Sequence, residues 1–503
     1  MTGGRRGWCS AALCCALAGA LSCWLAASAF AAPARRADAF VDSIGVNTHT
    51  YYGTPAYSDY AGWRDKLLGS GIRYIRENLQ RSSSRQVSRI NDLYAAGGIR
   101  ASFIFDPRTD RGGTVPDLFN RMKSSMLAAT AQAEGPNEYE NAHRSDWSTV
   151  ADAARAYQAQ LHKTINADPA TRHLTVLGPS VAYPSGYQAW GDLSGSLDAG
   201  NMHSYSGGRM PSASLAEWMT AAATTSATKP VQATETGYHN AIGSLSGHLP
   251  ASERAAGIYL PRLYLEYFRR GVRRTFAYEL LSEGTDILDI EDNFGLLRND
   301  YSDKPAMTAL RNLIALLEDP GPTFTAGTLN YTLTTAPGDV RRVLLQKRDG
   351  SFWLALWREV SVWDRINRVE LYPRSASVTL SLDQPMATVR TYLPNVSEAP
   401  TGSWTGRTNV TLDIGPQVTL VEFVPTSASP TTSSSGESSL DAARRRTGCR
   451  GSSKRRSRRG TRAQRMRASR AGTQRGQAGR KRAHRRASKR SACARRLRRA
   501  GRD

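Results

Sequence analysis

The central part of the chain lacks cysteine. Four of the six cysteines fall between residues 9 and 23, and the other two are Cys449 and Cys493. A disulfide framework and a cysteine-based zinc site are therefore excluded between these ends, and we expect a hydrophobic core large enough to fold without cross-links. Cys449 and Cys493 can pair, stay free or join two chains, and the sequence leaves these alternatives open.

The chain also lacks long apolar runs beyond its N-terminus. Mainly apolar residues extend from Ala11 to Phe30, follow Arg5 and Arg6, and end in the small-residue pattern Ala29-Phe30-Ala31. This pattern predicts a signal peptide over residues 1–31, with an uncleaved anchor helix as the alternative. No later segment reaches the roughly 20 apolar residues that cross a bilayer. We therefore expect a mature protein that is secreted or associated with the cell envelope, without a transmembrane segment.

A net charge is missing from most of the chain as well. The sequence carries +24 overall, but segment 426–503 holds 26 of its 67 basic residues and 3 of its 43 acidic residues. Residues 1–425 are left with 41 basic and 40 acidic residues. Because segment 426–503 is rich in arginine and poor in large apolar residues, we expect a disordered basic tail.

The composition of this tail limits the partners that we expect. It contains no aromatic residue on which a base could stack, so specific nucleic-acid binding is not indicated. Its charge favours nonspecific adhesion to an anionic cell-envelope polymer or an anionic lipid. An inert, solvated tail is the alternative.

The sequence between residues 42 and 319 alternates short apolar runs with longer amphipathic segments. The eight runs are Ser43–Thr48, Ile72–Glu77, Ile99–Phe105, Met126–Glu134, Leu174–Gly178, Leu197–His203, Pro230–Glu235 and Arg273–Glu279. Segments such as Ala151–Ile165 and Ala251–Phe268 have helical spacing between them. This alternation predicts an α/β protein with a (β/α)8 TIM barrel over residues 42–319. An open, doubly wound sheet is the alternative.

The helical pattern stops after residue 319. Strand-like runs follow at Val343–Gln346, Phe352–Trp357, Ser377–Leu382, Ala387–Leu393, Val410–Ile414 and Gln417–Val424. We predict a small β-sandwich accessory domain over residues 320–425. Four tryptophans of this region either offer stacking faces to sugars or, as is commoner, fill the core: Trp353, Trp357, Trp363 and Trp404.

Two glutamates follow predicted barrel strands at positions that suit catalysis. The fourth run leads into Glu134-Gly135-Pro136-Asn137-Glu138, and the seventh leads into Glu235. The carboxyl ends of parallel barrel strands share one face, where active sites are built. Because strands four and seven lie on opposite sides of an eight-stranded ring, Glu138 and Glu235 can face each other across a bound sugar.

Such a pair of carboxyl groups is what glycoside hydrolysis requires. One group protonates the leaving oxygen and the other attacks the anomeric carbon, at a separation of about 5–5.5 Å in retaining enzymes and about 6.5–9.5 Å in inverting ones. We expect the pKa of the acid to be raised by burial and by the neighbouring negative charge. The nucleophile must stay ionised, and Arg76, Asn137 and Tyr205 are the candidate hydrogen-bond donors to it.

These residues resemble the catalytic set of glycoside hydrolase clan A. Asn137-Glu138 is similar to the acid/base motif of the clan, Glu235 to its nucleophile, Arg76 to its strand-two arginine and His203-Ser204-Tyr205 to its accessory pair. The resemblance implies a retaining TIM-barrel glycosidase that cleaves β-linked sugars without a metal or an organic cofactor. We choose Glu138 over Glu134 as the acid because Asn137 stands directly before it.

The resemblance covers residues 42–425 and is nearest to families 39 and 5. It includes Asn293-Phe294-Gly295-Leu296-Leu297 and the following Lys304-Pro305-Ala306. One departure concerns strand eight, which reads Phe276-Ala277-Tyr278-Glu279 where clan members commonly have a tryptophan.

Further residues are candidates for binding the substrate or supporting the site. Glu279 either binds sugar hydroxyls or forms a structural ion pair, His49 at the end of strand one has a functional and a structural alternative as well, and Tyr238 is a candidate for substrate binding. Other aromatic residues that could stack on sugars are Tyr51, Tyr52, Trp63, Trp190 and Tyr205.

Each catalytic candidate also has a structural alternative. Glu138 could cap the helix that follows it, Glu235 could be a loop carboxylate, and His203 could be a core histidine. Arg76 could pair with Glu77 or Glu279. We predict a secreted hydrolase of O-glycosyl compounds; the alternative is a non-catalytic carbohydrate-binding or envelope-adhesion protein on a degenerate barrel.

Overall fold

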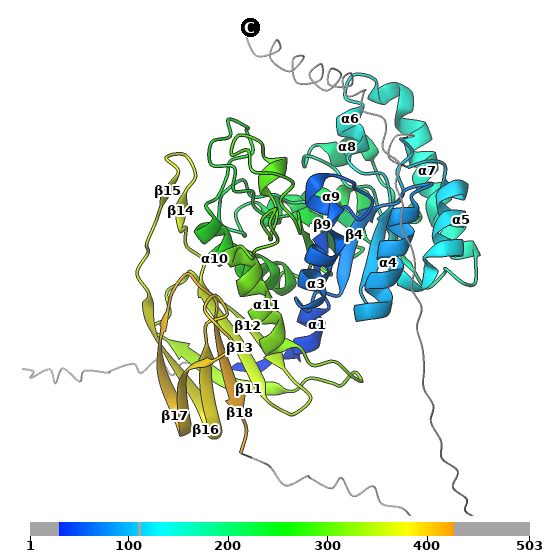
Figure 1. The fold of residues 1–503 in the computed structure, drawn as a ribbon. Coiled ribbons are helices and arrows are strands. Elements are labelled where there is room, and N and C mark those ends of the chain that lie inside the picture. Colours follow the sequence, from blue (N-terminus) through cyan, green and yellow to red (C-terminus); the bar gives the residue numbers. More distant parts are fainter. Residues whose placement is uncertain (1–29, 109–111, 427–503) are drawn as a thin grey trace, which may run out of the picture. The chain divides into compact units, whose positions relative to one another are not determined.

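The protein is described by a computed structural model, which covers residues 30–108 and 112–426 (Figure 1). Most of the predicted signal peptide, the basic tail and all six cysteines lie outside the described residues. None of the described helices combines the length and the apolar character that crossing a membrane requires.

Eight parallel strands form the sheet at the centre of the first region. They are β3 (Ile44–Asn47), β4 (Tyr74–Asn78), β5 (Arg100–Ile104), β6 (Thr130–Glu134), β7 (Thr175–Leu177), β8 (Gly200–His203), β9 (Val231–Thr236) and β10 (Thr275–Ala277). The order is β7-β6-β5-β4-β3-β10-β9-β8, and a bridge from Leu177 to Ala199 joins β7 to the residue before β8. The sheet thus closes almost completely, and the predicted TIM barrel is confirmed, with one strand in each predicted run.

One helix, α1, precedes the barrel, and further helices follow its strands and surround the sheet (Figure 1). The helices are α1 (Ala37–Val41), α2 (Pro55–Ser58), α3 (Tyr60–Leu68), α4 (Ser84–Gly97), α5 (Val115–Ser125), α6 (Tyr139–Ala142), α7 (Trp147–Ala167), α8 (Gly186–Trp190), α9 (Leu215–Ser226), α10 (Glu253–Arg269) and α11 (Pro305–Leu317). Helix α4 shows how the sequence sets the start and the end of a helix. Ser83 caps its first turn by accepting a hydrogen bond from the Gln86 amide, and Gly98 ends it with a φ of 66°.

An all-β region follows the barrel. Its strands are β11 (Thr328–Thr334), β12 (Val340–Gln346), β13 (Phe352–Arg358), β14 (Trp363–Asp364), β15 (Val369–Glu370), β16 (Ala376–Tyr392), β17 (Pro400–Ile414) and β18 (Thr419–Val424). Except for the β14–β15 hairpin, hydrogen bonds join these strands with β1 (Phe30–Pro33) and β2 (Arg35–Arg36) into one eight-stranded sheet. The all-β character agrees with the prediction, whereas the division into two stacked sheets of a sandwich stays a prediction.

Two predicted strands of this region are one strand in the structure. The runs Ser377–Leu382 and Ala387–Leu393 fall in β16, which pairs with β11 through its first part and with β18 through its second. The pairing of β16 with β17 shifts in register between Ser381 and Met386, which marks the place where the sequence suggested a break.

The buried tryptophans belong to the core, as the structural alternative predicted. Trp353 and Trp357 are almost completely buried, and Trp363 donates a hydrogen bond to the Pro250 carbonyl of the barrel at 2.9 Å. Trp404 is half-buried and packs against the core of the β region.

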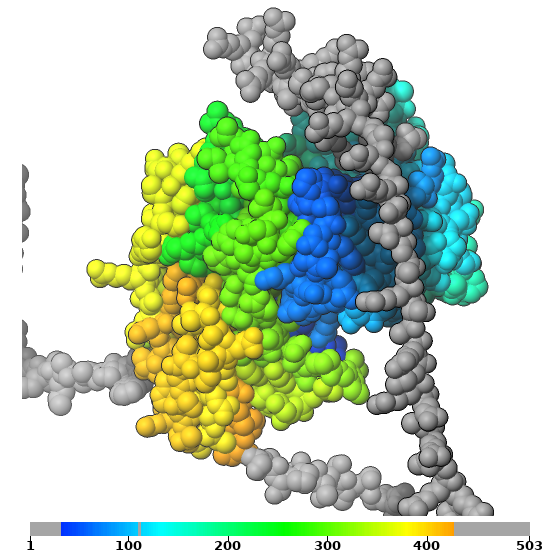
Figure 2. All heavy atoms as spheres, viewed as in Figure 1, coloured from blue at the N-terminus to red at the C-terminus, as the bar shows by residue number. Residues whose placement is uncertain are grey.

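Segments far apart in the sequence also meet inside the barrel, where the first barrel strand, β3, pairs with the last, β10. In Figure 2 the blue and green parts of the chain border each other.

A buried ion pair links helix α10 to the β region. Arg262 Nη2 lies 2.8 Å from Glu359 Oε2, and the two side chains are 0% and 2% exposed. The indole of Trp357 and the hydroxyl of Ser212 each donate a hydrogen bond to Glu359, both at 2.8 Å. Burial alone would raise the pKa of Glu359, but Arg262 and these donors outweigh it and lower the pKa.

Removing one partner of this pair is expected to destabilise the fold strongly. Glu359→Ala leaves the guanidinium of Arg262 buried without a counter-charge, which costs about 3–5 kcal/mol. The matched control is Asp152→Ala, because the Asp152 side chain is 101% exposed in its pair with Arg155, and we expect it to stay within about 0.5 kcal/mol of the wild type. Urea unfolding followed by tryptophan fluorescence measures both, and equal effects of the two substitutions would contradict the assignment.

Candidate active site

The candidate site is a cavity at the carboxyl ends of the barrel strands. Its volume is about 680 Å³, within the range of roughly 300–1,000 Å³ that accommodates small ligands. Six predicted site residues line it: His49, Arg76, Asn137, Glu138, Tyr205 and Glu235. His203 and Glu279 are buried against these residues, so the barrel brings together eight of the residues that the sequence analysis selected.

The structure places Glu138 and Glu235 face to face. Glu138 follows β6 and Glu235 belongs to β9, and a carboxylate oxygen of one lies within 4.8 Å of a carboxylate oxygen of the other. His203 stands between them, with Nδ1 at 2.8 Å from Glu138 Oε1 and at 3.5 Å from Glu235 Oε2. Two glutamates that are almost a hundred positions apart in the sequence therefore meet in one cavity.

The surroundings of Glu235 favour its ionised form. Arg76 Nη1 donates a hydrogen bond to Oε1 at 2.6 Å, and the Tyr205 hydroxyl donates one to Oε2 at 2.8 Å. Burial alone would raise the pKa of Glu235, but the charges of His203 and Arg76 and these hydrogen bonds lower it below its usual value. Glu235 is thus a buried carboxylate that stays charged, as a nucleophile must.

Arg76 is the cation around which these groups are arranged. It is 3% exposed, and its Nε and Nη2 donate hydrogen bonds to the two oxygens of Glu134 at 2.8 and 2.6 Å. Its partners are therefore Glu134 and Glu235, and the alternatives Glu77 and Glu279 are wrong. Glu134, which also accepts a hydrogen bond from Asn201 Nδ2 at 3.0 Å, is fully buried as the counter-ion.

The loop after β6 aims Glu138 into the cavity. Glu138 has left-handed backbone angles, φ 45° and ψ 40°, which cost a non-glycine residue about 1–3 kcal/mol. Its amide donates a hydrogen bond to the Ser180 carbonyl at 3.1 Å and so fixes this conformation. Glu138 stands at the N-cap of α6, but its side chain makes no capping hydrogen bond, so the alternative of a helix cap is wrong.

Asn137 is held from both sides beside Glu138. Its Oδ1 accepts hydrogen bonds from Arg76 Nη2 at 2.6 Å and from the Ser180 hydroxyl at 3.1 Å. These contacts fix the side-chain amide of Asn137 where the residue lines the cavity. Arg108, which sequence reasoning did not select, donates a hydrogen bond to the Asn137 carbonyl at 2.6 Å and supports the loop.

His203 lies between two glutamates that favour its protonated form. Burial alone would lower its pKa, but the neighbouring Glu235 and Glu138 raise the pKa above its usual value. On the other side of the ring, Nε2 lies 3.2 Å from the Thr234 hydroxyl. The imidazole is completely buried, and these contacts make it more than a packing residue.

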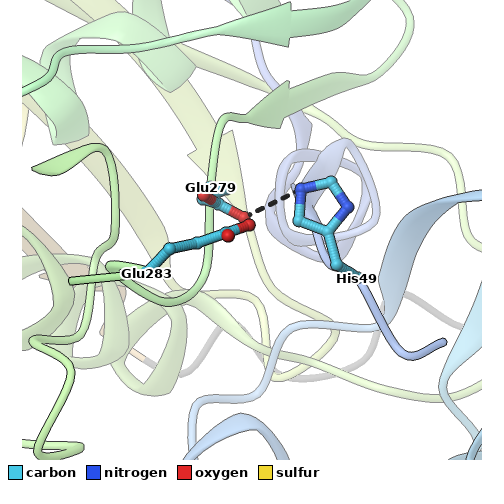
Figure 3. A group of neighbouring side chains, drawn as sticks. All are labelled: His49, Glu279 and Glu283. Atoms are coloured by element: carbon cyan, nitrogen blue, oxygen red, sulfur yellow. Dashed lines mark ion pairs between the residues drawn. The ribbon is translucent and has the colours of Figure 1, made fainter. Parts of the chain in front are cut away.

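A second group of titratable residues follows β3 and β10 (Figure 3). His49 and Glu283 line the cavity, and Glu279 is fully buried beside them. Glu279 Oε2 lies 3.1 Å from His49 Nε2 and accepts a hydrogen bond from the Tyr57 hydroxyl at 3.1 Å. The ring of His49 stacks on Tyr52 with centroids 4.4 Å apart. Burial alone would lower the pKa of His49, but Glu279 raises the pKa to about 9. Glu279 therefore forms an ion pair, one of its two alternatives from the sequence, and its partner is His49, which the sequence did not indicate.

Two acidic residues of this side were not selected as site residues from the sequence. Glu283 and Glu291 both line the cavity, and Glu291 accepts a hydrogen bond from the Tyr278 hydroxyl at 3.0 Å. Burial and the nearby Glu279 raise the pKa of Glu283 to about 7. Glu283 and Glu291 lie in a long loop after β10. No periodic pattern in the sequence of this loop shows which side chains turn back toward the barrel.

Three predicted aromatic residues are placed elsewhere. Tyr238 does not line the cavity; its hydroxyl donates a hydrogen bond to the Arg209 carbonyl at 3.0 Å and its ring packs on Tyr259. Trp63 and Trp190 are fully buried in the hydrophobic core, so their selection as sugar-stacking residues is wrong. Tyr51 and Tyr52 do line the cavity.

Metal binding has two candidate groups among the described residues. Glu138, His203 and Glu235 form one, and His49, Glu279 and Glu283 form the other, each with ligand atoms within 4.8 Å of one another. The first group is connected internally by the contacts of His203 and is stabilised by Arg76. That the site works without a metal or an organic cofactor stays a prediction.

Comparison with known proteins gives a similarity of fold. The sequence matches no family model and no curated protein. The structure is similar to that of a family 39 glycoside hydrolase from the gut symbiont Bacteroides cellulosilyticus WH2, with 15% identity, 78% of this chain and 83% of that chain covered, and a TM-score of 0.52. It is also similar to a monomeric β-xylosidase from Caulobacter crescentus CB15, with 16% identity, coverages of 79% and 98%, and a TM-score of 0.49.

The ion pair of His49 predicts how stability depends on pH. Because folding raises the pKa of His49 from 6.5 to about 9, protonated His49 stabilises the fold below pH 6.5, and this contribution is lost as the pH rises toward 9. The difference in unfolding free energy between wild type and His49→Gln should therefore shrink over this range, by up to about 3 kcal/mol.

Urea unfolding at a series of pH values measures this difference. The control is His173→Gln, since His173 is exposed, and its difference from the wild type should not vary with pH. Glu77 and Glu283, whose pKa values burial raises to about 7, titrate at the lower end of the window. A constant difference for His49→Gln across the window would rule out the charged pair.

Proposed function

We propose that this protein is a retaining glycoside hydrolase that cleaves β-type O-glycosidic bonds in an oligo- or polysaccharide. Glu138 is the proposed acid/base and Glu235 the proposed nucleophile. The observation that carries the proposal is the approach of these two carboxylates to within 4.8 Å at the bottom of a sugar-sized cavity. The barrel fold, which places both at the carboxyl ends of strands, supports it.

The first half of the proposed reaction transfers the sugar to the protein. The carboxyl group of Glu138 donates its proton to the glycosidic oxygen while a carboxylate oxygen of Glu235 attacks the anomeric carbon. The glycosidic bond breaks, the leaving group departs as an alcohol, and Glu138 is left as a carboxylate. The short separation favours direct attack, because an inverting enzyme needs room for a water molecule between the two groups.

The second half releases the sugar. The Glu138 carboxylate removes a proton from water, whose oxygen attacks the anomeric carbon and displaces Glu235 as a carboxylate. Two successive inversions retain the anomeric configuration. Overall one glycosidic bond and one water molecule are consumed, and both glutamates return to their starting protonation states.

The surroundings of the two glutamates suit these different roles. Glu235 is 13% exposed and fixed by Arg76 and Tyr205, whereas Glu138 is 29% exposed and its carboxylate contacts His203. When Glu235 becomes a neutral ester, Arg76 keeps its bidentate contact with Glu134. The buried guanidinium is therefore never left without a counter-charge during the cycle.

A non-catalytic carbohydrate-binding or envelope-adhesion protein is the competing proposal. It gives no reason for two carboxylates that both contact one buried histidine, His203. Turnover decides between the two, with the products from β-glucans, mannans, xylans and arabinans identifying the polymer and proton NMR of the first product identifying its anomer.

Substitution of the two glutamates should separate their roles. On an aryl β-glycoside we expect Glu138→Ala and Glu235→Gly each to lower kcat by about 10²–10⁴-fold or more. Azide should rescue both, with a glycosyl azide of retained configuration from Glu138→Ala and of inverted configuration from Glu235→Gly.

The matched control for these substitutions is Glu217→Gln, an exposed acidic residue on helix α9. It should hydrolyse the aryl glycoside at the rate of the wild type. Full activity in either Glu138→Ala or Glu235→Gly would end the assignment.

We further propose that the protein is exported and that its basic segment 426–503 adheres to an anionic cell-envelope polymer. The charge of this segment and the apolar N-terminal run support the proposal. Deletion of 426–503 should leave hydrolysis of a soluble substrate unchanged and release the protein from the cell surface in a fractionation assay. Equal surface retention of both forms would contradict it.

A further inference from the structure

The side of the cavity next to Glu235 is acidic beyond the needs of the proposed reaction. Glu279 and Glu283 follow β10, the strand adjacent to β9 that carries Glu235. Figure 3 shows both side chains directed toward each other and toward His49. Ligand atoms of the three residues lie within 4.8 Å of one another, so two carboxylates share a space the size of one small group.

This group has hydrogen-bonding capacity that the protein does not use. The Glu279 side chain is fully buried, yet its Oε1 has no hydrogen-bond partner. Among the described residues, none donates a hydrogen bond to the carboxylate of Glu283. A buried carboxylate oxygen without a donor is unfavourable, and a bound ligand with N–H or O–H groups would satisfy it.

The charges around the group also lack balance. His49 is the described cation that forms an ion pair there, and it is already engaged with Oε2 of Glu279. Lys304 points elsewhere, because its ammonium donates hydrogen bonds to Asn240 Oδ1 and the Asn293 carbonyl, both at 3.0 Å. Glu291 adds a further acidic group at the same side of the cavity. One positive charge therefore faces three carboxyl groups.

We propose that this acidic corner binds a protonated amine on the sugar residue held at Glu235, so that the substrate is an amino sugar with a free amine. The proposal rests on the proposed function, since it names the class of sugar that the same cavity accepts. An ammonium offers N–H groups to Glu279 Oε1 and Glu283 together and supplies the missing positive charge. A sugar carboxylate at this position meets like charges and is excluded.

A divalent cation is the competing occupant, and the state of His49 disfavours it. A metal ligand must be a neutral imidazole with a free lone pair, whereas Glu279 raises the pKa of His49 to about 9 and keeps the ring protonated. A ligand that donates N–H groups needs no such change.

Calorimetric titration of the wild-type protein tests the proposal without requiring turnover. The probes are glucose and galactose, their 2-, 3-, 4- and 6-amino-deoxy forms, and the corresponding uronic acids. We expect at least one amine to bind at least about tenfold more tightly than its parent sugar, and the uronic acids to bind more weakly than the parent. Calcium and zinc salts are titrated alone in a separate arm.

The preference for the amine should be lost in Glu283→Gln and kept in the control Glu217→Gln. Glu283→Asp preserves the charge and should keep part of the preference, so it decides the matter if the glutamine variant does not fold. The proposal is overturned if no amine exceeds its parent sugar, if a uronic acid binds as tightly, or if calcium or zinc binds in a Glu283-dependent way. Loss of hydrolysis in the Glu138 and Glu235 variants is measured separately, so the proposed function can stand while this proposal fails.

Discussion

The site depends on one buried cation, the guanidinium of Arg76. A charge that is removed from water must be compensated on all sides, and Arg76 meets this requirement with two carboxylates and two side-chain amides, those of Glu134, Glu235, Asn47 and Asn137. Its planar fork fixes the direction of each partner. The same contacts that neutralise Arg76 therefore position Glu235 and the loop that carries Glu138.

This arrangement divides the cavity into two parts with different electrostatics. Around Arg76 and His203, hydrogen bonds hold the side chains of Glu235 and Glu138 in place. Around His49, the acidic groups exceed the basic ones, and burial shifts the pKa of Glu283 to about 7. A ligand that fills the cavity therefore contacts both regions. The charges balance around Arg76, and the region around His49 is acidic.

The sequence predicted the barrel well because its evidence is local. Strands such as β3 (Ile44–Asn47) fall in short, mainly apolar runs, and helix α4 carries a buried stripe between recognisable ends, Ser83 and Gly98. The β region was harder, because β16 changes partners along its length and no local pattern shows where one pairing stops. The strands β1 and β2 were missed since they pair with segments that lie some 300 residues later.

The same distinction explains which site residues were found. Glu138, Glu235, Arg76 and His203 lie at or near strand ends, where the barrel geometry gives a reason to select them. Glu283 and Glu291 lie in a loop whose path depends on tertiary contacts. Tyr238 contacts Arg209 and Tyr259 instead of lining the cavity. This orientation depends on packing and cannot be predicted from the spacing of residues in the sequence.

The pairing of β1 and β2 has a consequence for the order in which the molecule forms. These strands precede the barrel in the chain but belong to the sheet that follows it, where β1 pairs with β11 and β2 with β12. During synthesis, the residues that start the described structure must wait until the ribosome has made the whole barrel and residues 328–346. The two regions are thus completed together, and a truncated chain that ends after the barrel leaves its first strands without neighbours.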